Sequence, residues 1–65
     1  MTTIEFYAGP LGIRLVGAVT VGAKSARDNA KAVGKLLCKI NHLNELEAVL
    51  IGEDGEETDK FMVYR

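Results

Sequence analysis

The stretch that decides the fold is Ser25–Asn41, SARDNAKAVGKLLCKIN, because its apolar side chains recur with the period of a helix. On a wheel of about 100° per residue, these side chains fall within one arc of about 120°. They are Ala26, Ala30, Val33, Leu36, Leu37 and Ile40. Ser25 is a good N-cap, and Asp28 after it completes a capping-box-like pattern. We therefore expect an amphipathic helix that covers one face of a sheet.

Cationic side chains lie opposite the apolar arc and form a basic stripe. The stripe consists of Lys24, Arg27, Lys31, Lys35 and Lys39. Cys38 projects beside Gly34 and Lys35, so we expect it off the core, without a redox or catalytic role. Gly34 weakens a helix relative to alanine and is a candidate site of close packing.

Two strand-like segments precede the helix. Thr3–Ala8 alternates apolar and polar residues, Ile13–Val21 is apolar and β-branched, and the turn residues 9–12 separate them. The predicted hairpin places six side chains under the helix, namely Ile4, Phe6, Ile13, Leu15, Val19 and Val21. Gly17 falls among them, which indicates either a close approach of the helix or a β-bulge.

A second hairpin follows the helix, and its turn sets its register. Asp54-Gly55 is the preferred centre of a two-residue turn. This turn pairs Glu53 with Glu56, Leu50 with Asp59, Ala48 with Phe61, and Leu46 with Val63. One face then holds Leu46, Ala48, Leu50, Phe61 and Val63, and the other holds Glu45, Glu47, Val49, Ile51, Lys60, Met62 and Tyr64. The first face is apolar, as burial beneath the helix requires.

These elements predict an α+β fold of ββαββ order, a mainly antiparallel four-stranded sheet with one helix on one face. The helix returns the chain beside the first strand, so we expect the strand order 2-1-3-4. At 65 residues the chain forms a single domain over residues 1–65. A domain of this size buries only about 60% of its unfolded surface. Homodimerisation would add stability, and it stays one of the alternatives.

Few side chains are suited to catalysis, so we expect no enzyme and no cofactor. Ser25 is explained as a helix cap, and the single histidine, His42, has no partner that would orient it as a base. One cysteine and one histidine cannot form a structural zinc site. The acidic segment Glu53–Asp59 lacks the ligand spacing of a calcium loop. Residues 1–5 lack the pattern of a signal peptide and no apolar run reaches the about 20 residues of a membrane span, so we expect a cytoplasmic protein.

Charge is divided along the chain. The net charge of −1 combines +4 over residues 1–42, from six basic and two acidic residues, with −5 over residues 43–65, from two basic and seven acidic residues. We expect the basic stripe of the helix and the acidic second hairpin to point in different directions.

The sheet face away from the helix, together with the acidic hairpin, is the predicted partner-binding surface. It comprises Glu5, Tyr7, Glu45, Glu47, Val49, Ile51, Glu53, Asp54, Glu57, Met62 and Tyr64, with Val16 and Lys60 beside them. An apolar, aromatic patch on such a sheet needs a partner or a second copy to cover it. Carboxylates two residues apart on a strand are separated by about 6.6 Å, close to the spacing of successive phosphates along a DNA strand. Glu45 and Glu47, together with the Glu53–Asp59 loop, could therefore occupy a basic DNA-binding cleft on another protein.

This organisation resembles the small phage-encoded anti-CRISPR inhibitors. The features that carry the resemblance are the first hairpin, the helix with Ser25-x-x-x-x-Ala30-Lys31, and the Asp54-Gly55 hairpin, which together cover most of the chain. The family shares no sequence signature, so the resemblance transfers no functional residue. It implies a non-enzymatic protein that binds a DNA-binding subunit of a CRISPR effector complex in the host cytoplasm and blocks DNA capture or cleavage. The basic stripe departs from a purely acidic DNA mimic.

Two other functions stay open at this point. The basic stripe could track a phosphate backbone, although its cations are not accompanied by a base-reading Asn, Gln or aromatic residue and the net charge is acidic. A homo-oligomeric, antitoxin-like regulatory protein would instead cover the exposed sheet face with a second copy.

Overall fold

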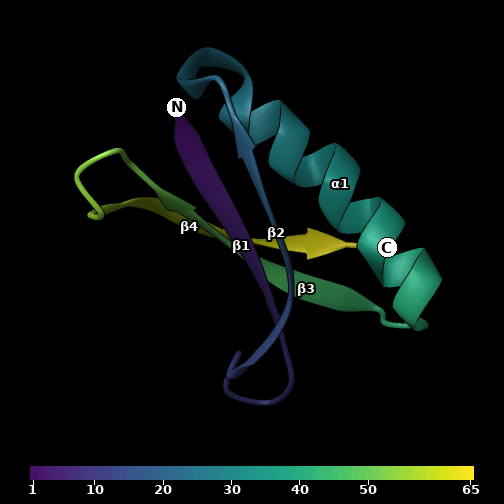
Figure 1. Cartoon of the computed structure of the whole chain (residues 1–65). Coiled ribbons are helices and arrows are strands. Elements are labelled where there is room, and N and C mark those ends of the chain that lie inside the picture. The colour runs from purple at the N-terminus through teal and green to yellow at the C-terminus, as the bar shows by residue number, and fades with distance from the viewer.

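The computed structural model describes all residues, 1–65, and confirms the ββαββ order (Figure 1). The elements are β1 (Thr2–Ala8), β2 (Arg14–Val21), a 3-10 turn η1 (Ala23–Ser25), α1 (Ala26–Asn41), β3 (Glu45–Ile51) and β4 (Glu57–Tyr64). All neighbouring strands are antiparallel, and their order in the sheet is β2-β1-β3-β4. The predicted fold class and strand order are therefore confirmed.

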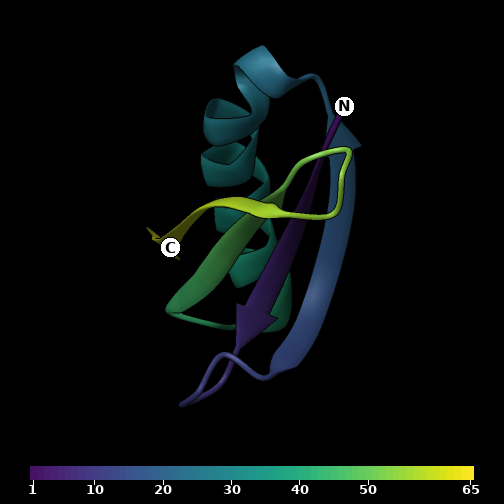
Figure 2. The same cartoon turned by 90° about the vertical axis from the view of Figure 1, so that its left-hand side faces the viewer.

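The sheet is strongly twisted, and α1 covers one of its faces (Figures 1 and 2). Ten buried apolar residues form the core between the helix and the sheet; they are Ile4, Phe6, Ala8, Ala26, Ala30, Cys38, Leu46, Ala48, Leu50 and Val63. The opposite face carries no helix, and we call it the open face. No helix of the structure combines the length and apolarity needed to cross a membrane.

The helix packs through small side chains rather than through its largest ones. Ala26, Ala30, Gly34 and Cys38 recur every four residues and are all buried. The expectation that Cys38 lies off the core is wrong, because its side chain is 0% exposed. Leu36 and Ile40, expected in the buried arc, are 56% and 63% exposed. A row of small residues lets the helix backbone approach the sheet closely, and this rotates the large side chains to the flank.

The helix ends where the sequence predicts, but its N-terminus is built differently. Ser25 occupies the N-cap position without a capping hydrogen bond, so the capping box with Asp28 does not form. Its Oγ instead donates to the carbonyl of Gly22 at 3.4 Å, within the 3-10 turn that leads into the helix. At the other end, His42 adopts a left-handed conformation with φ 56°, and the N–H of Leu43 donates to the carbonyl of Cys38 at 2.8 Å. This arrangement satisfies the last carbonyls of the helix.

A β-bulge in β2 changes the side-chain assignment of the first hairpin. Phe6 pairs with Gly17 and Tyr7 pairs with Leu15, so Val16 is the extra residue. Leu15 therefore lies on the open face with Tyr7, and Val16 packs against the core, the reverse of both expectations. Ile13, expected beneath the helix, precedes the strand and is 77% exposed. The bulged residue shifts the alternation of every residue before it.

Both interpretations of Gly17 hold in the structure. The bulge is directly next to it. In addition, a Cβ atom at Gly17 would lie 3.3 Å from Cδ1 of Leu37, so the missing side chain makes room for α1. The helix and the bulge thus meet at one point of β2.

The second hairpin has the predicted register but a longer turn. The pairs Leu46–Val63, Ala48–Phe61 and Leu50–Asp59 form as expected. The expected pairing of Glu53 with Glu56 is wrong, because the N–H of Gly52 donates to the carbonyl of Glu56 at 2.9 Å. The turn itself is closed by the N–H of Gly55, which donates to the carbonyl of Gly52 at 3.0 Å. Gly55 has φ +84°, a conformation that favours glycine, and this residue allows the four-residue turn.

Candidate partner-binding face

The open face consists of cross-strand rows that mix apolar side chains with carboxylates. From β2 to β4, one row is Leu15, Tyr7, Glu47 and Met62, the next is Ala18, Glu5, Val49 and Lys60, and Glu45 lies opposite Tyr64 beyond them. Each carboxylate therefore has apolar or aromatic neighbours across the sheet. Such a surface can contribute buried apolar area and directional polar contacts to the same partner.

The apolar members of the open face are accessible to a partner. Tyr64 is 60% and Met62 38% exposed. Tyr7, Val49 and Ile51 are partly buried by their neighbours but lie outside the buried core. Leu15, which the bulge brings to this face, is also exposed. The predicted apolar surface is therefore exposed, at least in part, on the monomer.

Two of the carboxylates on this face have defined surroundings. The hydroxyl of Tyr7 donates to Oε1 of Glu5 at 2.7 Å. This hydrogen bond, aided by partial burial and by the charge of Glu5, raises the pKa of Tyr7. The carboxylate of Glu47 lies against the first turn, where a Cβ atom at Gly12 would be 2.8 Å from its Oε1. Gly12 has φ +59° and lacks that atom, so the turn can fold back onto Glu47.

A groove of about 670 Å³ lies at the end of the open face. It runs between the β1–β2 turn and the segment that joins α1 to β3, and its lining includes Tyr7, Leu11, Glu45, Glu47 and Met62. Sequence reasoning did not include Leu11 or Leu15 in the partner-binding surface. The sequence offers a signal for Leu11, because a leucine between turn-forming Pro10 and Gly12 is expected to be exposed. The bulge that exposes Leu15 leaves no signal in the apolar pattern.

The structure divides the predicted carboxylate set into two groups. Glu45 and Glu47 lie on the open face, whereas Glu53 and Asp54 belong to the turn beyond the far end of β3, about 20 Å away for a seven-residue strand. The N-terminal ammonium donates a hydrogen bond to Glu53 and holds the pKa of that carboxyl below its usual value. Asp54 accepts a hydrogen bond from the N–H of Glu56 at 3.0 Å. These turn carboxylates make contacts within the chain and do not extend the open face.

Glu57 also has a partner within the chain. Its Oε1 lies 3.9 Å from Nζ of Lys60, three residues further along β4. Both side chains are about half exposed, so this ion pair adds little stability.

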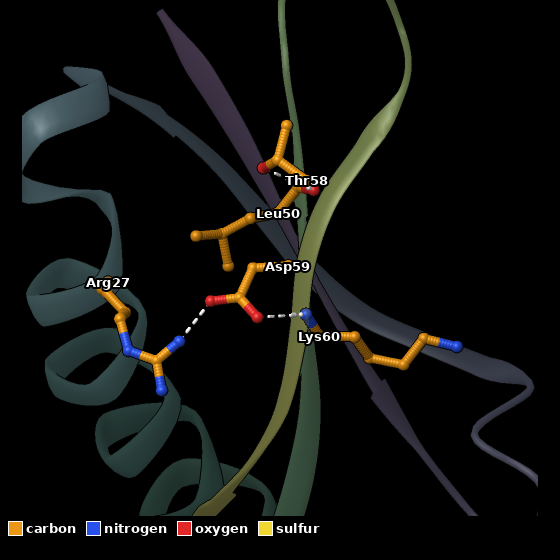
Figure 3. A network of polar contacts seen from close by, with 5 residues as sticks. All are labelled: Arg27, Leu50, Thr58, Asp59 and Lys60. Carbon is orange, nitrogen blue, oxygen red and sulfur yellow. Dashed lines mark hydrogen bonds and ion pairs between the residues drawn. The ribbon is translucent and has the colours of Figure 1, made fainter.

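Two members of the basic stripe, Arg27 and Lys35, reach β4 instead of facing away from the sheet. Arg27 forms an ion pair with Asp59, whose other oxygen accepts the N–H of Lys60 at 2.9 Å (Figure 3). The guanidinium of Arg27 also lies 4.4 Å from the ring centroid of Phe61. The acidic and basic regions therefore meet at this edge, and the expectation that they point in different directions is wrong there.

Lys35, another member of the basic stripe, also contacts β4. Nζ of Lys35 donates to the carbonyl of Tyr64 at 3.1 Å. The remaining members, Lys24, Lys31 and Lys39, are exposed and make no ion pair. Three separated lysines form a weaker phosphate-binding surface than five cations in line.

The reactive side chains do not come together. Burial raises the pKa of the Cys38 thiol, against the opposing charges of Arg65 and Lys35. His42 is exposed at the end of the helix. No group of three or more His, Cys, Asp or Glu side chains is close enough to hold a metal ion.

Comparison of the chain with protein-family models, with curated proteins and with solved structures found no match.

Proposed function

We propose that this protein is a non-enzymatic binding protein that docks through its open face onto a basic, nucleic-acid-binding surface of another protein and blocks it. The observation that supports this proposal is the combination of exposed apolar side chains with carboxylates that lack ion pairs. Tyr64 and Met62 are exposed, and Glu45 and Glu47 lie beside them without a cationic partner. A docking surface with this composition selects a partner that is both basic and partly apolar.

The spacing of the carboxylates favours a partner that binds DNA. Glu45 and Glu47 are two residues apart on β3, so they project from the same face about 6.6 Å apart. Glu5 extends the negative charge along the neighbouring strand β1. The anti-CRISPR resemblance specifies the partner further, as a DNA-binding subunit of a CRISPR effector complex. Docking there would exclude DNA by occupying its binding cleft.

The test uses the immobilised chain to capture CRISPR effector subunits, with duplex DNA as competitor. We expect capture that DNA prevents and that the double substitution Glu45→Lys and Glu47→Lys abolishes. The matched control, Lys31→Glu with Lys39→Glu, changes as many charges on the opposite side of the molecule and should leave capture intact. Circular dichroism establishes that each variant is folded.

Two outcomes would contradict the proposal. Capture that persists in the Glu45→Lys, Glu47→Lys variant at physiological salt would exclude the open face as the docking surface. Direct binding of DNA by the chain in a gel shift, lost in the Lys31→Glu, Lys39→Glu variant, would assign the function to the basic stripe instead.

A further inference from the structure

The groove at the end of the open face lies between two separate parts of the chain. The β1–β2 turn, residues 9–12, forms one wall and extends beyond the sheet at the end where α1 leads into β3 (Figures 1 and 2). Residues 43–47 form the other wall. The volume of about 670 Å³ lies within the range of about 300–1,000 Å³ that is usual for ligand-binding cavities. The groove is therefore large enough for a side chain of a partner together with the main chain that carries it.

The lining of the groove combines apolar side chains with carboxylates. Glu47 on β3 has Tyr7 of β1 as its neighbour on one side and Met62 of β4 on the other. Leu11, in the turn, also lines the groove and is 81% exposed. Apolar surface thus lies on both sides of a carboxylate. This arrangement suits a long cationic side chain, because its aliphatic stem can pack on apolar surface while its charged end meets the carboxylate.

The two carboxylates of the groove form no polar contact within the chain. Neither Glu45 nor Glu47 makes a hydrogen bond or an ion pair through its side chain. The hydroxyl of Tyr7, which lies across from Glu47, already donates to Glu5 at 2.7 Å. Glu47 is also partly buried and lies against Gly12 of the turn. The groove therefore holds uncompensated negative charge in partly apolar surroundings, where a cation is attracted more strongly than in open water.

We infer that this groove binds an arginine side chain carried on an extended segment of the partner protein. The inference rests on the proposed function, because it names the group of the partner's basic surface that the groove recognises. A guanidinium binds a carboxylate through two parallel hydrogen bonds and has further donors for a second carboxylate. Glu45 and Glu47 project from the same face of β3 about 6.6 Å apart, so one guanidinium between them can bind both.

The apolar lining favours arginine over lysine. A guanidinium is less strongly hydrated than an ammonium group and stacks on aromatic rings, so it loses less on entering a groove lined by Tyr7 and Met62. Side chains alternate along an extended segment, so the residues two positions before and after the arginine lie on its side of the segment. Apolar residues at these two positions would meet the apolar surface that flanks Glu47. The groove thus selects an arginine with apolar neighbours at this spacing.

Titration of the isotope-labelled full chain with the blocked peptide acetyl-Leu-Gly-Arg-Gly-Leu-amide, followed by nuclear magnetic resonance, tests the inference. We expect saturable shifts of the amide signals of Leu11, Glu45, Glu47 and Met62. Lysine in place of the arginine should raise the dissociation constant at least about fivefold, and citrulline, the uncharged analogue, should abolish saturation. Glu47→Gln should also raise it at least about fivefold, because one charged partner is lost. Glu56→Gln, which removes an exposed and equally unpaired carboxylate from the β3–β4 turn, is the matched control and should change nothing.

Two results would overturn the inference. Absence of saturable shifts at peptide concentrations up to about 20 mM would exclude an arginine site. Equal affinity for the arginine and lysine peptides would show a general acidic surface instead, and the proposed function could still stand if effector subunits are captured. The proposed function fails separately, when the arginine peptide binds as expected but no CRISPR effector subunit is captured. The groove is then an arginine site for a partner of another kind.

Discussion

The close approach of α1 to β4 makes Gly34→Ala a sensitive test of the packing. A Cβ atom at Gly34 would lie 2.8 Å from Cγ1, 3.0 Å from Cβ and 3.1 Å from Cγ2 of Val63. Rotation of the valine side chain cannot relieve these contacts, because its own Cβ atom is one of them. Val63 is 3% exposed and lies in the core, so β4 or the helix must move.

Two opposing effects determine the magnitude. Overpacking a well-packed core costs about 1–3 kcal/mol. Replacing a glycine by alanine inside a helix stabilises it by about 1 kcal/mol. Since three atoms of Val63 crowd the new methyl group, we place the cost of overpacking near the middle of its range. The expected net result is a loss of about 1 kcal/mol in the free energy of unfolding, or about 4–8 °C in Tm for a domain of this size.

Urea denaturation followed by circular dichroism measures this change, with Gly17→Ala as the matched control. At Gly17 the nearest atoms are the flexible ends of Leu37, at 3.3 and 3.6 Å, so we expect a neutral or slightly stabilising effect. In a Val63→Ala background the cost of Gly34→Ala should shrink, because both γ-methyl groups of Val63 are removed and only its Cβ atom stays close to the new methyl group. Stabilisation by Gly34→Ala of about 1 kcal/mol would refute the packing, because helix propensity would then act alone.

Three further predictions concern individual groups. Cys38→Ser should destabilise the protein by about 1–3 kcal/mol in urea denaturation, because it buries a hydroxyl in an apolar site. Because the native thiol is buried, it should react with a thiol reagent no faster than the protein unfolds. The pKa of Glu53 is lowered in the folded state, so its contribution to stability is present above the ordinary glutamate pKa and is lost as the pH falls through the lowered value. In thermal melts at a series of pH values, Glu53→Gln should therefore reduce the fall of Tm at acid pH. An unchanged fall of Tm would contradict the contact of Glu53 with Met1. Tyr7 should ionise above the ordinary tyrosine pKa in an ultraviolet titration, and Glu5→Gln should move that pKa back toward its usual value; no change would exclude the hydrogen bond between them.

The second hairpin and the helix could be predicted because independent signals agree there. The alternation of Leu46, Ala48 and Leu50 along β3 matches that of Phe61 and Val63 along β4, and the structure forms these pairs. A shift of one residue would have exposed the whole apolar set, so the register was strongly determined. The turn between β3 and β4 was less well predicted, because Gly52 can take part in a chain reversal as readily as Gly55. The structure forms a longer turn that begins at Gly52 and ends at Gly55.

The first hairpin could not be predicted in detail, because β2 is apolar on both faces. In Arg14–Val21, RLVGAVTV, apolar residues occupy both even and odd positions. Alternation therefore carries no information on where an extra residue is inserted. The bulge moves Leu15 to the open face and Val16 to the core without any change in the apolar pattern.

The position of the helix on the sheet depends on side-chain size, and a helical wheel that considers only hydrophobicity does not take size into account. The wheel assigns Leu36 and Ile40 to the buried arc because they are strongly apolar. In the structure the row with the smallest side chains lies closest to the sheet, so Gly34 and Cys38 are buried instead. Arg27 and Asp59 are 32 residues apart in the sequence, and the helix position is what brings them together.

This helix position also determines the charge of the open face. The row of small residues turns Arg27 and Lys35 of the basic stripe toward β4, where Arg27 is neutralised by Asp59 and Lys35 binds the carbonyl of Tyr64. These cations lie on the helix side, so the sheet separates them from the open face. The carboxylates Glu5, Glu45 and Glu47 remain there with Lys60 as the single cation among their rows. A division of charge along the sequence thus becomes a division between the two faces of one sheet, and the face without a helix is the acidic one.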